Sequence, residues 1–148
     1  VNSGYFRNGF SIQTGSGGAS LAVVKYLRQS MIEQNVKASF ALGGITSHMV
    51  KLHKEGLIDH LIDVQSFDRV AAESLRDDPK HKEVSANEYA SPDEPGAATK
   101  FLDIVILSAL AVDTNFNVNV LVGSDGIIRG AIGGHPDTAA DSALSIVV

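Results

Sequence analysis

The sequence FSIQTGSGGAS, residues 10–20, runs from an apolar segment through a glycine-rich turn into a helical pattern. Phe10 to Ile12 predict a short strand, and Ser20 is placed to cap a helix over residues 21–34. Adjacent glycines allow positive φ and let a ligand approach the main chain without a Cβ in the way. A strand, a tight turn and a helix in this order indicate an α/β domain.

A second glycine-rich turn, GAIGGHPDT, occupies residues 130–138 and precedes a short helix predicted over residues 138–143. The start of a helix offers unpaired N–H donors and the positive end of the helix dipole. Two such turns in one small domain therefore predict a site for an anion, or for a carbonyl that becomes anionic during a reaction.

Strands and helices alternate along the rest of the chain. Apolar runs predict strands at residues 38–42, 61–64, 102–107, 117–122 and 143–148, the last of them buried. Helices are predicted at residues 46–55, capped by Thr46, and 68–76. The alternation predicts an open, largely parallel sheet flanked by helices. Residues 77–100 have the composition of loops, and no helix or strand is predicted there.

The composition narrows the class of protein. The 148 residues fit one domain, and a net charge of −5 without a basic cluster argues against nucleic-acid binding. The absence of cysteine excludes disulfides, a thiol nucleophile and a thiolate metal site. No membrane span or signal peptide is visible, so a cytoplasmic location is expected. Because the chain starts without Met and stops on an apolar run, we expect a piece of a longer polypeptide.

The first glycine turn matches neither of the common nucleotide motifs. Ser20 stands where a dinucleotide-binding fingerprint needs its last glycine, and no Gly-Lys-Ser/Thr is present. From the residues alone, Gly15 to Gly18 are as consistent with a structural turn as with a cradle for an anion or acyl group.

Several polar residues near the second turn are candidates for binding. His135 follows two glycines directly and favours a ligand-facing role. Arg129 precedes the turn and is suited to grip a carboxylate, although a surface arginine is an equal interpretation. Asn117 and Asn119 share one face of a predicted strand and line either a polar pocket or the solvent. No metal site is predicted, since only His135 and Asp137 have ligand-like spacing.

Five segments together resemble one family over residues 9–148, in the same order along the chain. They are FSIQTGSGGASLAV (10–23), ASFALGGIT (38–46), DVQSFD (63–68), ALAVDTNFNVNVLVGSDG (109–126) and RGAIGGHPDTA (129–139). These segments resemble the citrate lyase alpha chains. More distantly, residues 106–139 resemble the CoA-transferase superfamily, with Ala131 replacing the first glycine of a Gly-x-Gly-Gly turn. The resemblance implies a CoA-transferase-type (NagB/RpiA-like) α/β domain, one of two in a longer chain.

The resemblance also implies an activity and its partners. A citrate CoA-transferase of this family exchanges acetyl for citryl on the thioester of an acyl carrier protein and releases acetate. The acyl group is then carried by a phosphopantetheine-type prosthetic group on the carrier protein (gamma) subunit, and no cofactor is expected on this domain. Citryl-carrier cleavage is implied for a separate lyase (beta) subunit.

Gln13 separates this chain from glutamate-dependent CoA-transferases. Those enzymes carry a nucleophilic glutamate a few residues ahead of a Ser-Asp-Gly turn, and the matching turn here, residues 16–18, places Gln13 at the glutamate position. An amide cannot form the acyl-enzyme intermediates that a carboxylate can. The resemblance therefore implies direct exchange in a ternary complex.

The resemblance distributes roles among the candidate residues. Gly17, Gly18, Gly133 and Gly134 are expected to donate hydrogen bonds to developing oxyanions, and Gln13 and Ser16 to orient the acyl group. The candidate citrate contacts are Arg129, Asn117, Asn119 and His135, with Asp137 orienting His135.

Three alternative functions remain open on the residues. The first is a glutamate-dependent CoA-transferase, against which Gln13 argues unless another domain supplies the glutamate. The second is a sugar-phosphate isomerase on the same fold, for which Asp137 is the nearby acid/base candidate. The third is a non-catalytic anion-binding module.

Overall fold

The structure is a computed structural model that describes residues 3–15 and 17–148. In chain order the elements are β1 (Phe10–Thr14), α1 (Gly18–Glu33), β2 (Ala38–Ile45), α2 (Ser47–Lys54), β3 (Ile58–Ser66), α3 (Arg69–Asp77), β4 (His81–Glu83), α4 (Ala86–Tyr89), the 3₁₀ helix η1 (Ala98–Phe101), β5 (Ile104–Leu107), β6 (Ala111–Val112), β7 (Val118–Asn119), α5 (His135–Asp141) and β8 (Leu144–Val147).

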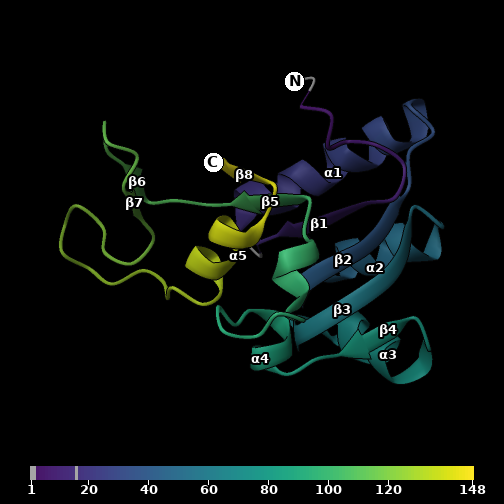
Figure 1. The fold of residues 1–148 in the computed structure, drawn as a ribbon. Helices are drawn as coiled ribbons and strands as arrows, with labels where there is room; N and C mark the ends of the chain where they lie inside the picture. The colour runs from purple at the N-terminus through teal and green to yellow at the C-terminus, as the bar shows by residue number, and fades with distance from the viewer. Residues whose placement is uncertain (1–2, 16) are drawn as a thin grey trace.

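Six of the strands form one sheet in the order β4-β3-β2-β1-β5-β8 (Figure 1). Every neighbouring pair in this sheet is parallel, so the predicted open parallel sheet is confirmed. Its central strand β1 is buried along its whole length, as expected for a parallel strand covered on both faces.

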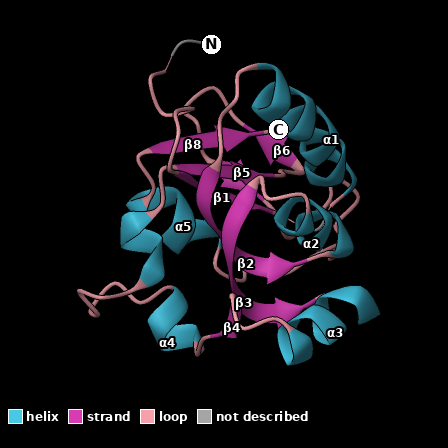
Figure 2. Cartoon of the chain, turned by 90° about the vertical axis from the view of Figure 1, so that its right-hand side faces the viewer, coloured by secondary structure: helices cyan, strands magenta, loops and turns pink. Residues whose placement is uncertain are grey.

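Helices cover both faces of the sheet. Figure 2 shows α1, α2 and α3 on one side and α4 and α5 on the other. The first layer encloses the larger apolar core, to which β1 contributes Phe10 and Ile12 and α1 contributes Met31. A smaller core under α4 and η1 contains Tyr89 and Val105. The chain is therefore a three-layer α/β domain.

The chain reverses its direction of growth beside β1. It first lays β2, β3 and β4 on one side of β1 and then returns to place β5 on the other side. Asp103 and Ser11 close this return, because the Ser11 N–H donates to Asp103 Oδ2 at 3.0 Å and the Asp103 N–H donates to Ser11 Oγ at 2.8 Å. In open α/β sheets ligands bind at such a switch point, beyond the carboxyl ends of the strands.

Two predicted boundaries next to the glycines were wrong. The first helix begins at Gly18 with Gly17 as its N-cap, so Ser20 lies inside it rather than capping it. The predicted strand of residues 38–42 does not end at Gly43 but continues to Ile45. It continues because Gly43 takes a φ of +100°, and the pairing register shifts between Gly43 and Gly44.

Asp68 caps two helices. Its Oδ1 accepts the Ala71 N–H of α3 at 2.9 Å, and its Oδ2 accepts the Ser47 N–H of α2 at 2.6 Å. The predicted cap Thr46 does occupy the N-cap position of α2, but its side chain makes no capping hydrogen bond. The carboxylate of Asp68 satisfies that end of α2 and joins the two helices.

The last third of the chain differs most from the expectation. Of the strand predicted at residues 117–122, only Val118 and Asn119 belong to a ladder of paired residues, in the two-stranded hairpin β6–β7 that extends away from the body (Figure 1). The turn at residues 124–126 is followed by a single bridge between Val122 and Ile128. The strand predicted as buried at the C-terminal end, β8, forms the sheet edge and is largely exposed.

The loop-like segment of residues 77–100 contains three elements that the sequence did not predict: β4, α4 and the beginning of η1. Short elements escape periodicity arguments because they complete no repeat. Of these, α4 has a recognisable signal, a capping box between Ser85 and Glu88.

Candidate functional site

A cleft of about 590 Å³ opens at the carboxyl ends of the central strands. Its walls are the end of β1 with the first glycine turn, the segment after β5, and the second glycine turn. The lining includes residues 13–15, Gly17, Gly44, Tyr89, residues 107–110 and residues 129–135. The two glycine-rich turns, separated by more than a hundred residues in sequence, therefore face one cleft at the switch point of the sheet.

Gln13 lies at the end of β1 on the side of the sheet that carries α4. Its side chain is 7% exposed, and its Nε2 donates to the Tyr89 hydroxyl at 2.7 Å. Its Oε1 is buried and has no hydrogen-bond partner among residues 3–15 and 17–148. A buried amide with one unused acceptor is unusual in a folded protein and marks a place where a ligand or a movement is expected.

Gly43 makes room for this amide. A Cβ at residue 43 would lie 2.9 Å from Gln13 Cδ, closer than real Cβ contacts, and the φ of +100° would strain any other residue. Gly43, inside β2, therefore leaves room for the side chain of Gln13 on the neighbouring strand.

The first glycine turn brings β1 close to the segment after β5. A Cβ at Gly17 would lie 3.4 Å from Ser108 Oγ, so the two walls nearly touch there. Gly17 has an extended backbone and is the N-cap of the 16-residue helix α1. The N–H groups in the first turn of such a helix have no acceptor one turn earlier, so this turn supplies donors. Gly18 is the first residue of α1, and Ser16 lies outside the described residues.

The second glycine turn packs against Tyr89. Gly133 takes a φ of +52°, and a Cβ at Gly134 would lie 2.6 Å from the Tyr89 hydroxyl oxygen. His135 begins α5, and its Nε2 is buried without a hydrogen-bond partner among the described residues. Asp137 lies in the first turn of the same helix, and no hydrogen bond joins it to His135 within residues 3–15 and 17–148. Its role in orienting His135 stays a prediction.

Burial raises the pKa of the Tyr89 hydroxyl, and the nearby charge of Asp137 raises it further, against a lowering by the hydrogen bond from Gln13. The phenol is therefore neutral at physiological pH. It accepts one hydrogen bond from Gln13 and keeps its own proton.

The remaining predicted contacts lie on the exposed segment between β5 and α5. Arg129 lines the cleft and forms an ion pair with Asp125 four residues earlier. Asn117 donates to Asp113 at 2.8 Å, and Asn119 donates to the Val122 carbonyl at 2.7 Å. Both asparagines stabilise turns of their own segment and do not line the cleft. As citrate contacts they remain a prediction, to which this geometry gives no support.

Sequence reasoning missed several residues of the lining, among them Tyr89, Phe67, Gly44 and Ser108. Tyr89 lies in the segment that looked like a loop, Gly44 lies in β2, and Phe67 lies between β3 and α3. Ser108 had a usable signal, since it directly follows the buried strand of residues 104–107. The end of a strand adjacent to a switch point is a place to look for binding residues.

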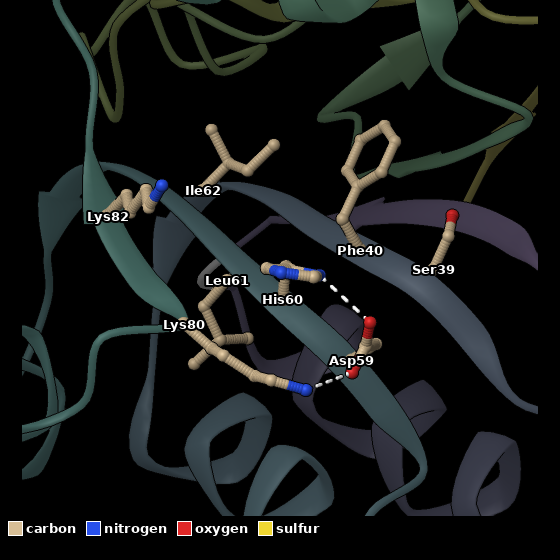
Figure 3. Close-up of a pocket in the computed structure, with 8 residues that line it drawn as sticks. All are labelled: Ser39, Phe40, Asp59, His60, Leu61, Ile62, Lys80 and Lys82. Atoms are coloured by element: carbon tan, nitrogen blue, oxygen red, sulfur yellow. Dashed lines mark hydrogen bonds and ion pairs between the residues drawn. The ribbon is translucent and has the colours of Figure 1, made fainter.

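A second hollow of about 450 Å³ lies near the amino ends of β2 and β3 (Figure 3). Two of its side chains point to the same carboxylate: Lys80 Nζ lies 2.5 Å and His60 Nδ1 lies 3.1 Å from oxygens of Asp59. The hydrogen bond from Lys80 lowers the pKa of Asp59. Since neither glycine turn borders this hollow and its carboxylate, Asp59, is already paired with Lys80, the cleft is the better candidate site.

The described part of the chain contains no group of three or more His, Asp or Glu side chains placed to hold a metal ion. Within the same residues, no helix is long and apolar enough to cross a membrane.

Comparison with known proteins gives consistent matches along the whole chain. The family described as "Citrate lyase, alpha subunit (CitF)" matches residues 1–148. The chain is 63% identical to the citrate lyase alpha chain of Haemophilus influenzae over 146 residues and 62% identical to that of Escherichia coli K12 over 148 residues. These matches cover 99% and 100% of this chain but 29% of each relative.

Solved structures show the same relationship. The crystal structure of the alpha subunit of citrate lyase from Streptococcus mutans, in complex with citrate, matches with a TM-score of 0.94 and 58% identity. That match covers 98% of this chain and 29% of the other. A RipA structure matches at 17% identity with a TM-score of 0.71, over 98% of this chain and 34% of the other, and shows the shared fold.

Proposed function

Since the chain belongs to the family of citrate lyase alpha subunits, we propose that its cleft is part of the acyl-exchange site of a citrate CoA-transferase. The observation that carries the proposal is the meeting of two glycine turns and Gln13 in one cleft at the switch point of the sheet. A citrate complex of the Streptococcus mutans relative supports citrate as the substrate.

The proposed reaction has two steps and no acyl-enzyme. A carboxylate oxygen of citrate attacks the carbonyl carbon of the acetyl thioester, and the C–S bond breaks to release the thiolate of the carrier. The thiolate then attacks the citryl carbonyl of the mixed anhydride, and the anhydride C–O bond breaks to release acetate. Gln13 has no carboxylate to take part, so the chain is suited to direct exchange rather than to covalent catalysis.

Each step places negative charge on a carbonyl oxygen. In this proposal the backbone N–H groups of Gly17 and Gly18, and of Gly133 and Gly134, donate to these oxygens. Backbone donors fixed before the reaction need no reorganisation, and the loss of one donor costs on the order of 10²–10³ in rate. Gln13 would orient the acyl group from the end of β1.

Arg129 and His135 are the citrate contacts that the cleft geometry favours. Both line the cleft, and a guanidinium group suits a carboxylate by two parallel hydrogen bonds. Citrate would compete with Asp125 for Arg129, because these two residues form an ion pair. Asp137 lies in the first turn of α5, two residues after His135.

The acyl carrier enters this reaction as a substrate. A phosphopantetheine-type arm on the carrier protein subunit would bring the thioester into the cleft, and the citryl-carrier product would pass to the lyase subunit. The chain itself needs no further cofactor in this proposal, and the cytoplasmic location expected from its sequence is part of the same proposal.

The test is acyl exchange by the full-length alpha chain with acetyl-carrier protein and labelled citrate. Transfer of label to the carrier with release of acetate is expected. His135→Ala should raise the KM for citrate, whereas His48→Ala, at an exposed position of α2, should not. Absence of label on the carrier, with a correctly folded chain and an acylated carrier, would contradict the proposed function.

A further inference from the structure

Tyr89 comes from the segment of residues 77–100, for which no role was predicted. It is the last residue of α4, and its side chain is 8% exposed. It lines the cleft beside Gln13, although 76 positions separate the two residues in sequence. The buried side chain of Tyr89 thus connects α4 to the wall of the cleft, and this placement points to a role in the site.

The contact between Tyr89 and Gln13 fixes the rotation of an amide. The terminal torsion of a glutamine side chain is soft, so the amide has no preferred orientation of its own. Gln13 Nε2 donates to the Tyr89 hydroxyl at 2.7 Å, and Gln13 Oε1 has no partner in the part of the chain that the structure describes. The Tyr89 hydroxyl is thus the hydrogen-bonding group that holds this amide.

Two glycines on other parts of the chain leave space for the pair. A Cβ at Gly43 would collide with the amide carbon of Gln13, and a Cβ at Gly134 would lie 2.6 Å from the Tyr89 hydroxyl oxygen and ring edge. These glycines come from β2 and from the second glycine turn. Both glycines therefore leave the room that the contact between Gln13 and Tyr89 needs.

We propose that Tyr89 is a positioning residue, which holds the Gln13 amide in the orientation needed for acyl exchange and fixes the distance between α4 and the second glycine turn. The proposal rests on the proposed function, because it assigns a role within the same site. Tyr89 acts through Gln13 and touches no reacting atom in this scheme.

A positioning role differs from proton transfer in its dependence on pH. Burial raises the pKa of Tyr89, so the hydroxyl stays protonated over the range of an exchange assay. Tyr89→Phe should consequently lower the rate by the same factor across that range. A general base would instead have to ionise within that range, which the raised pKa of Tyr89 disfavours.

The decisive experiment is a double-mutant cycle in the full-length chain with Gln13→Ala, Tyr89→Phe and both together. Tyr89→Phe should lower kcat by about 10- to 100-fold, as misplacement by a fraction of an ångström does, with the KM for citrate within about twofold. In the Gln13→Ala background the same change should have no further effect on kcat. Tyr26→Phe, at a tyrosine that is 66% exposed, is the matched control.

Independent losses of kcat that multiply in the double variant would overturn the proposal, as would an unchanged kcat in Tyr89→Phe. If the wild-type chain exchanges no acyl group, the proposed function fails instead, and a second measurement decides the role of Tyr89. In protein labelled with ¹⁵N-glutamine, the side-chain signals that disappear in Gln13→Ala identify this amide. Slow hydrogen exchange of that amide, lost in Tyr89→Phe, supports the contact, and unchanged exchange overturns it.

Discussion

Replacing Gln13 by glutamate tests why this position carries an amide. The two side chains have nearly the same shape, so Gln13→Glu keeps the packing against Gly43 and changes the charge. The new carboxylate would be 7% exposed, with the neutral Tyr89 hydroxyl as its neighbour. It would also stand where the carboxylates of citrate are proposed to bind.

The size of the effect follows from Coulomb's law. Two unit charges about 4 Å apart repel by about 4 kcal/mol at an effective dielectric constant near 20. That energy corresponds to about a 10³-fold loss of kcat/KM for citrate, because each ~1.4 kcal/mol is a factor of ten. The thermal unfolding temperature at pH 5 should change little, since the protonated glutamate is close to glutamine in shape and charge.

The loss of kcat/KM in Gln13→Glu should depend on pH. Burial disfavours the ionised form, so the pKa of a glutamate at this position should lie above its ordinary value. As the pH falls through that pKa, the variant becomes neutral and its deficit in kcat/KM relative to wild type should shrink. Gln34→Glu, at an exposed position after α1, adds the same charge away from the cleft and should show no deficit. A Gln13→Glu enzyme that turns over citrate like the wild type at neutral pH would refute this reasoning.

Three further outcomes are expected. Borohydride added with acetyl-carrier should leave the activity intact because no enzyme thioester exists to be reduced, and donor-dependent inactivation would disprove direct exchange. The exchange step should survive EDTA, whereas loss of activity restored by a divalent ion would show that a metal is needed. Asp68→Ala should lower the free energy of unfolding by about 1–2 kcal/mol through the loss of its caps. Because hydrogen bonds from Ser47 and Ala71 outweigh burial and lower the pKa of Asp68, this difference, measured by urea unfolding, should fall as the pH drops below the ordinary value of 3.8.

The sequence predicted the layered architecture because its strongest signals are local. The apolar run of residues 102–107 and the helical pattern after the first glycine turn each reveal an element without reference to the rest of the chain. Boundaries were less predictable where tertiary contacts decide them. β2 runs through Gly43 because a bulge and the neighbouring strand permit it, and the cap of α2 is a carboxylate from the loop before α3.

The site could be predicted only in part. The glycine turns and Gln13 carry sequence signals, and the structure brings them into one cleft. Tyr89 has no such signal, because its importance comes from a contact with a residue on another element. Asn117 and Asn119 show the opposite case, since a period-two spacing suggested a shared face where the chain forms local turns.

The pairing of β5 with β1 has a consequence for the order in which the molecule is assembled. Ser11 and Asp103, which close that pairing, lie 92 residues apart, whereas β1 to β4 are joined by neighbouring segments. Contacts of such separation form slowly, since a long stretch of chain has to lose its freedom before they stabilise anything. During synthesis the wall after β5 cannot join the first glycine turn until Asp103 has left the ribosome. The half-finished chain would then already possess most of its larger core while still lacking any place for a substrate.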